Sequence, residues 1–268
     1  MEELRAIAVT PRHQIRLAAE YLPLIDNPPG RDFVVHVIEQ RQANGLPLMS
    51  AEIVIAGTQT RAQFPMAAQY PLHFRKTYFA ARLHGDPQQE YELALRASGL
   101  ANLPPPIGAS HNQVRHCFIP GRPYRRLSPF DADGEEQNLR RARDLHLATA
   151  AGLWRLLEDA YAMLVNLHAG GLTHGDTQLQ NFIVSPAPLE VILIDFEATE
   201  TRESADDALW AKRCAADFAP LLQEALLLQV TLGRQLGALA DHACQRAPEL
   251  FRDAARVTRY IEQLEEIA

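Results

Sequence analysis

Residues capable of chemistry gather in one short stretch of the chain. Asp176 ends the sequence His174-Gly175-Asp176, Asn181 follows five residues later, and Asp195 follows nineteen residues after Asp176. An aspartate in a loop can accept or orient the proton of an attacking hydroxyl group. The side-chain carbonyl of Asn181 and the carboxylate of Asp195 are oxygen ligands, which magnesium prefers together with phosphate oxygens. The residue types and their spacing therefore suit a site that combines a proton acceptor with a bound hard cation.

The flanking sequence predicts the elements that would hold these residues. An apolar stripe at helical spacing predicts a helix upstream. It consists of Leu153, Leu156, Leu157, Ala160, Tyr161, Leu164 and Leu167. The glycine pair at 170–171 ends this helix. Two short strands, 182–184 and 191–194, then flank a turn that contains proline, and such a hairpin would hold Asn181 and Asp195 on one rigid support.

This pattern resembles the catalytic loop and metal-binding motif of the protein-kinase-like superfamily, in which a His-x-Asp loop with a following asparagine precedes Asp-Phe-Gly. Gly175 stands where eukaryotic protein kinases have arginine, as in atypical Bud-type and RIO-type kinases, lipopolysaccharide core (Kdo/heptose) kinases and aminoglycoside phosphotransferases. The resemblance implies ATP and Mg²⁺ as cofactors. It also implies Asp176 as catalytic base, in a loop with His174, and Asn181 and Asp195 as magnesium ligands.

A kinase also needs a lysine for the nucleotide phosphates, paired with a glutamate on a helix. Lys76 lies in a plausible strand, and Glu90 lies in the first turns of a predicted helix, which suits a third strand followed by the regulatory helix. Glu92 is a rival for the glutamate, and Arg75 and Arg82 are rivals for the lysine. The alternative is that all of these are exposed charges.

The resemblance assigns weaker roles to four other residues. Phe118 and Ile119, in the strand before Pro120, would flank adenine, although an ordinary strand end explains them nearly as well. Gly57, in 56–60, is the nearest candidate for a loop over the phosphates, because no Gly-x-Gly-x-x-Gly precedes the lysine. Asp217 resembles the aspartate that begins a buried helix and braces the catalytic loop.

Departures from the family pattern shape the choice of acceptor. Glu197 replaces the motif glycine, Gln178 replaces a lysine, and little sequence separates Asp195 from Asp217 for a peptide-docking platform. The expected acceptor is a hydroxyl on a lipopolysaccharide sugar, a small molecule or one dedicated protein. An aminoglycoside-type kinase is the second hypothesis, and the acidic pair at 206–207 is compatible with it. The third is a nucleotide-binding pseudokinase, favoured by the missing glycine loop.

The coarse pattern predicts an α+β, two-lobed fold. A short helix is expected from Thr10 to about Tyr21, in an N-terminal extension, 1–45, of unclear role. A β-rich lobe, 46–120, is expected to contain an antiparallel sheet and one helix, 88–97, capped at its start by Asp86 and Pro87. A helical lobe, 121–268, carries the catalytic loop, with helices from about 207 to the end.

Bulk composition restricts the possible partners. Among 268 residues, 26 are Lys or Arg and 33 are Asp or Glu, for a formal net charge of -7. Because nucleic acid is attracted by a basic field, no nucleic-acid partner is expected. No apolar run approaches the length of a membrane span, which leaves only a peripheral membrane contact. The N-terminus has no signal-peptide pattern and the three cysteines lack CxxC spacing, so a cytoplasmic location is predicted.

Overall fold

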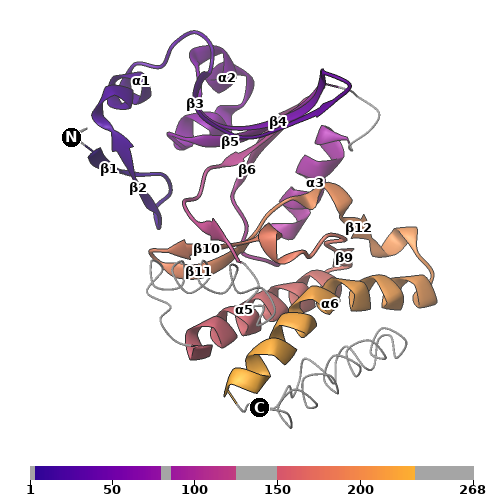
Figure 1. Ribbon diagram of the computed structural model, residues 1–268. Coiled ribbons are helices and arrows are strands. Elements are labelled where there is room, and N and C mark those ends of the chain that lie inside the picture. The colour runs from indigo at the N-terminus through magenta and orange to yellow at the C-terminus, as the bar shows by residue number, and fades with distance from the viewer. Residues whose placement is uncertain (1–3, 80–85, 125–149, 233–268) are drawn as a thin grey trace. The chain divides into compact units, whose positions relative to one another are not determined.

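The computed structural model describes residues 4–79, 86–124 and 150–232, and the chain divides into two compact units. Unit 1 comprises Met1–Gly99 with Leu103–Gly121, and unit 2 comprises Leu100–Asn102 with Arg122–Ala268. Sheet strands dominate unit 1, and long helices appear in unit 2 (Figure 1). The predicted α+β class is therefore confirmed.

Unit 1 is built on a five-stranded antiparallel sheet in the order β3-β4-β5-β7-β6. Its strands are β3 (Phe33–Ala43), β4 (Leu46–Ile55), β5 (His73–Tyr78), β6 (Pro106–Ser110) and β7 (Gln113–Cys117). The helix α3 (Pro87–Ala97) follows β5, and the 3-10 helix η2 (Pro65–Gln69) and helix α2 (Thr58–Gln63) lie between β4 and β5. The predicted cap of α3 is confirmed, because Asp86 accepts a hydrogen bond from the Gln88 amide at 2.9 Å.

The β-rich lobe was predicted to begin at 46, but its sheet begins earlier in the chain, with β3. The predicted boundary falls at the turn of the β3–β4 hairpin. Asn44 and Gly45 both have positive φ, 50° and 77°. Two consecutive left-handed residues form the type I′ turn that suits a tight antiparallel hairpin, and Asn-Gly is its preferred sequence. This signal was present in the sequence and was missed.

The predicted helix from Thr10 to Tyr21 is wrong. A hairpin of β1 (Leu4–Ala8) and β2 (Gln14–Ala18) occupies most of this range, followed by η1 (Ala19–Tyr21) and α1 (Leu22–Asp26). The Thr10 hydroxyl accepts the amides of Arg12 and His13 at 3.1 and 3.0 Å. The side chain therefore stabilises a tight turn, the alternative that threonine offers to a helix start.

Unit 2 packs two long helices, α5 (Ala150–Ala169) and α6 (Asp207–Leu232), against each other, and α5 also packs on β11 (Leu189–Leu193). The strand β10 (Phe182–Pro186) pairs with β11 and with β8 (Arg122–Pro123). Short elements complete the unit: β9 (Leu172–Thr173), η3 (Leu179–Asn181), η4 (Phe196–Ala198), β12 (Glu200–Thr201) and η5 (Arg202–Ser204). Where the structure describes the chain, no helix is long and apolar enough to cross a bilayer.

Candidate functional site

The predicted site residues fall in both units, and each group is described within its own unit. In unit 2, Asp176 follows β9, and Asn181 is the last residue of η3. The Asn181 side-chain amide donates to the Asp176 backbone carbonyl at 2.8 Å and to its carboxylate at 3.1 Å. These contacts orient the aspartate carboxylate and leave the carbonyl oxygen of the Asn181 side chain as the atom suited to a cation.

The β10–β11 hairpin brings Asp195 to Asn181. The backbone amide of Ile194 donates to the Asn181 carbonyl at 3.0 Å, so the residue before Asp195 is bonded to the predicted metal ligand. Asp195 has φ 67° and ψ 76°, a left-handed conformation that is rare for residues other than glycine. Since such backbone strain clusters at functional sites, the conformation supports a role for this carboxylate beyond packing.

Asp217 fixes the loop that carries Asp176. One oxygen of its carboxylate accepts the His174 amide at 2.7 Å and the other accepts the Gly175 amide at 2.9 Å. His168 Nε2 lies 3.0 Å from the carboxylate, and the Thr177 hydroxyl donates to the Asp217 carbonyl at 2.7 Å. Asp217 lies inside α6 and not at its start, which corrects its predicted place in the helix.

His174 is buried and its ring is held on several sides. Nε2 lies 2.9 Å from the Ile194 carbonyl, Nδ1 lies 3.4 Å from the Asp176 amide, and the ring packs edge-on against Phe196. These contacts link the loop of Asp176 to the strand end of Asp195. The ring contacts are those of a residue that positions this loop, and the predicted place of His174 among the catalytic residues stays a prediction.

In unit 1, Lys76 Nζ lies 3.6 Å from Glu90 Oε2, and both side chains are buried. Glu92 is exposed and bonds to Gln88 on its own helix, so Glu90 is the glutamate of the pair. Arg75 points to the opposite face of β5, as alternation along a strand requires. Arg82, the other rival, lies outside the described residues.

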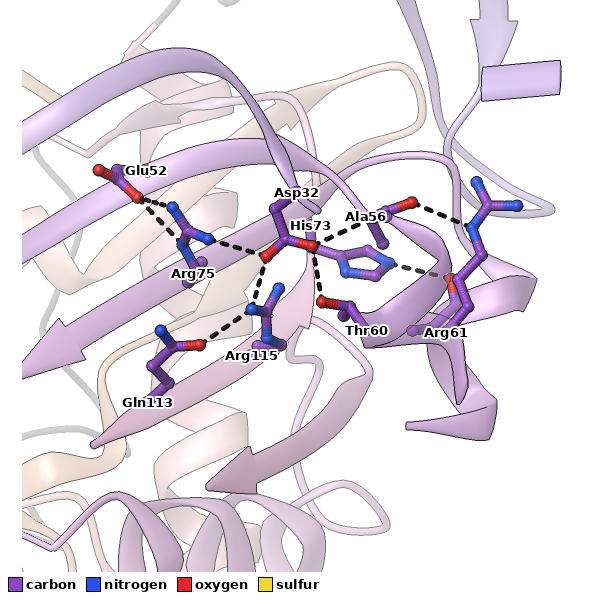
Figure 2. A network of polar contacts seen from close by, with 11 residues as sticks. Asp32, Glu52, Ala56, Thr60, Arg61, His73, Arg75, Gln113 and Arg115 are labelled. Carbon is purple, nitrogen blue, oxygen red and sulfur yellow. Dashed lines mark hydrogen bonds and ion pairs between the residues drawn. The ribbon is translucent and has the colours of Figure 1, made fainter. Parts of the chain in front are cut away.

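Arg75 belongs to a partly buried polar network that no sequence motif indicated (Figure 2). Asp32 accepts hydrogen bonds from Arg75 at 2.8 Å and from Arg115 at 2.6 Å, and Arg75 also bonds to Glu52. Glu52, Arg75 and Arg115 are direct neighbours across β4, β5 and β7. Burial alone would raise the pKa of Asp32, but the hydrogen bond from Thr60 and the charge of Arg115 hold it below its usual value.

The same network occupies the loop that was proposed to cover phosphates. The amide of Gly57 donates to Asp32, and the next two amides donate to the carbonyls of Pro29 and Gly30. A Cβ at Gly57 would lie 2.4 Å from the backbone of Arg31. The glycine is therefore required for close backbone packing, and its amide is bonded to Asp32, while its predicted role in phosphate binding stays a prediction.

The predicted adenine-binding residues pack inside unit 1. Phe118 packs against a cluster that contains Ile55 and Leu72, and its amide donates to the Leu72 carbonyl at 3.0 Å. Ile119 is buried. Phe118 therefore contributes to packing within unit 1, and a contact of these two residues with adenine stays a prediction.

No protein-family model and no curated protein matches this chain. The site must therefore be argued from its own geometry. Unit 2 offers a carboxylate oriented by Asn181, together with oxygen atoms on Asn181 and Asp195, and the amide of Ile194, which precedes Asp195, donates to the Asn181 backbone carbonyl. Unit 1 offers a buried ammonium beside Glu90. The first set suits a hard cation and a hydroxyl acceptor, and the second suits an anion.

Proposed function

We propose that this chain is an ATP- and magnesium-dependent phosphotransferase of the protein-kinase-like type. The observation that carries the proposal is the bonding of Asn181, whose amide orients the Asp176 carboxylate while its backbone carbonyl bonds the residue before Asp195. A base and two oxygen ligands held in this way are the parts that phosphoryl transfer to a hydroxyl requires.

The donor chemistry fits magnesium. Asn181 and Asp195 would hold it through oxygen atoms, with phosphate and water completing its shell. When bound, the cation neutralises charge on the transferred phosphoryl group. Asp176 would accept the proton of the acceptor hydroxyl, while Asp217 and His174 keep the loop in place.

Unit 1 supports the proposal independently. Its Lys76–Glu90 pair is carried by the third strand of the five-stranded sheet and by the helix that follows, where kinases carry theirs. Lys76 is also one of two lysines among the 26 Lys and Arg residues of the chain. A lysine presents a compact point charge to a phosphate, whereas an arginine presents a planar fork.

The test is ADP production from ATP and magnesium by the wild-type chain, Asp195→Ala and Asp176→Ala. Assays with added sugars, amino alcohols and Ser/Thr proteins would identify the acceptor class. We expect the loss of Asp176 to lower turnover by about 10²–10⁴-fold. The matched control is Asp159→Ala, because Asp159 is exposed on α5.

Each result of this assay has a definite meaning. Turnover that falls in both site variants and persists in Asp159→Ala supports the proposal. ATP-dependent thermal stabilisation without turnover, with every acceptor class, would favour the pseudokinase hypothesis. Near-wild-type turnover in Asp176→Ala would exclude Asp176 as the base.

A further inference from the structure

The Lys76–Glu90 pair has a third member. The Tyr78 hydroxyl donates to Glu90 Oε2 at 2.8 Å, and Lys76 Nζ lies 3.6 Å from the same oxygen. Lys76 and Tyr78 are two residues apart on β5, so their side chains share one face of the sheet. Nζ also lies 5.2 Å from the centroid of the Tyr78 ring. All three residues are at most 5% exposed.

The two contacts of Glu90 differ in length. The tyrosine contact has the length of an ordinary hydrogen bond, whereas the ammonium lies beyond the roughly 2.7–2.9 Å of a charge-assisted hydrogen bond. A carboxylate oxygen that already accepts a hydrogen bond from a hydroxyl attracts a nearby cation less strongly. Of these two contacts of Glu90, the one with the Tyr78 hydroxyl is therefore the closer, and the one with the Lys76 ammonium is the longer.

We propose that Tyr78 is a positioning residue for Lys76. Its hydroxyl fixes the Glu90 carboxylate, and its ring and hydroxyl together set the separation between that carboxylate and the Lys76 ammonium, the group proposed to meet the polyphosphate of a nucleotide. This inference rests on the proposed phosphotransferase function and adds a residue to that site. Without the hydroxyl, Glu90 would move onto the ammonium and compete with the phosphates.

The chain contains its own reference for testing this arrangement, since Lys212 is exposed and Lys76 is buried. Trace acylation with acetic anhydride, read by mass spectrometry, gives the reactivity of Lys76 relative to Lys212. In Tyr78→Phe we expect this ratio to fall at least about threefold, because a tight pair with Glu90 keeps the amine protonated. The matched control is Tyr91→Phe, since Tyr91 packs on the same hydrophobic cluster as Tyr78.

Kinetics supply a second readout that a purely structural role would not produce. The KM for MgATP of Tyr78→Phe should rise about tenfold, with kcat within about twofold, because binding of the phosphates is what competes with Glu90. Tyr91→Phe should leave both constants unchanged. MgATP should also protect Lys76 from acylation in the wild type, and protection in Tyr78→Phe should need more nucleotide.

The outcomes separate this inference from the proposed function. A lowered acylation ratio without turnover or MgATP protection would support the role of Tyr78 toward Lys76 and count against the phosphotransferase. An unchanged ratio in a Tyr78→Phe protein with wild-type melting behaviour would overturn the inference. If that variant does not fold, Glu90→Gln gives the complementary test. The ratio must then rise, and a constant ratio would overturn the inference as well.

Discussion

The Asp217 carboxylate accepts the backbone amide of His174 at 2.7 Å, across 43 residues of sequence. This single contact joins the core of α6 to the loop that presents Asp176. Because the second carboxylate oxygen accepts the amide of Gly175, the loop is held at two consecutive peptide units. The position of Asp176, the candidate base, therefore depends on Asp217, a residue to which the proposed reaction assigns no chemical step.

Asp217→Asn should destabilise unit 2 and lower phosphotransferase activity. The neutral asparagine side chain lacks the charge that strengthens the hydrogen bonds from the His174 and Gly175 backbone amides. Its NH₂ group would also face one of these two backbone N–H donors. Hydrogen bonds to charged groups contribute about 1.5–3 kcal/mol each, so we expect a loss of about 2–4 kcal/mol in urea denaturation. Asp206→Asn is the control, because Asp206 caps α6 at the surface and asparagine also caps well. Equal stability of the two variants would contradict the bracing role.

Two glycines with the same backbone conformation should respond differently to alanine. Gly175 and Gly45 have φ of 82° and 77°. A Cβ on Gly175 would lie 2.1 Å from the Ala198 carbonyl oxygen, whereas nothing lies within 4 Å of one on Gly45. Gly45→Ala should cost about 1–2 kcal/mol, the cost of a left-handed alanine. Gly175→Ala should cost more than about 3 kcal/mol, because the crowding adds to that cost. Equal midpoints in urea would show that the loop tolerates the clash.

The local sequence was sufficient to predict much of unit 2. The apolar stripe of α5 and the glycines that follow it predicted the helix and its end, and the two strands of the hairpin were placed within about two residues. The spacing of Asp176, Asn181 and Asp195 is fixed by this one loop and hairpin. Such local arrangements are readable because helical and strand periodicity act over a few residues.

The network around Asp32 could not be predicted in the same way. Asp32, Glu52 and Arg115 lie far apart in the sequence, and they meet only because β4, β5 and β7 are paired in one particular register. The positions of the charged residues in the sequence do not indicate how these strands pair. The helix predicted at Thr10 failed for a different reason, since a threonine before proline fits both a helix cap and a tight turn.

His73 should make the protein sensitive to mild acid. It is buried in β5 and donates from Nε2 to the carbonyls of Ala67 and Tyr70. Burial lowers its pKa to about 4, from an ordinary value near 6.5. The unfolded chain therefore binds a proton that the folded chain does not bind between these two values. The stability that neutral His73 contributes is therefore complete above about pH 6.5. It is lost as the pH falls toward 4, by up to about 1.4 kcal/mol per pH unit.

The measurement is the free energy of unfolding in urea at several pH values from 4.5 to 7.5. The free energy of unfolding should change less steeply with pH in His73→Gln than in the wild type, by the equivalent of about one bound proton. His111→Gln is the control, because His111 is exposed in a turn and its loss should leave the slope unchanged. An identical slope in wild type and His73→Gln would show that other groups account for the acid sensitivity.

Asp32→Asn tests whether the network of Figure 2 holds unit 1 together. Removing one partner of a buried ion pair leaves the other charge uncompensated, at a cost of about 3–5 kcal/mol. Here two arginines lose their shared carboxylate, and Gly57 and Thr60 lose an anionic acceptor. We therefore expect a cost at the upper end of that range.

Glu39→Gln supplies the comparison, because its pair with Arg41 is exposed and such pairs contribute at most about 1 kcal/mol. The depressed pKa of Asp32 adds a pH signature. Its contribution is present above the ordinary pKa of an aspartate and is lost as the pH falls through the lower folded value, so acid should narrow the difference between wild type and Asp32→Asn. Urea midpoints at pH 7 and near pH 3 measure both effects. A difference that does not change with pH would mean that Asp32 stabilises unit 1 through packing and not through its charge.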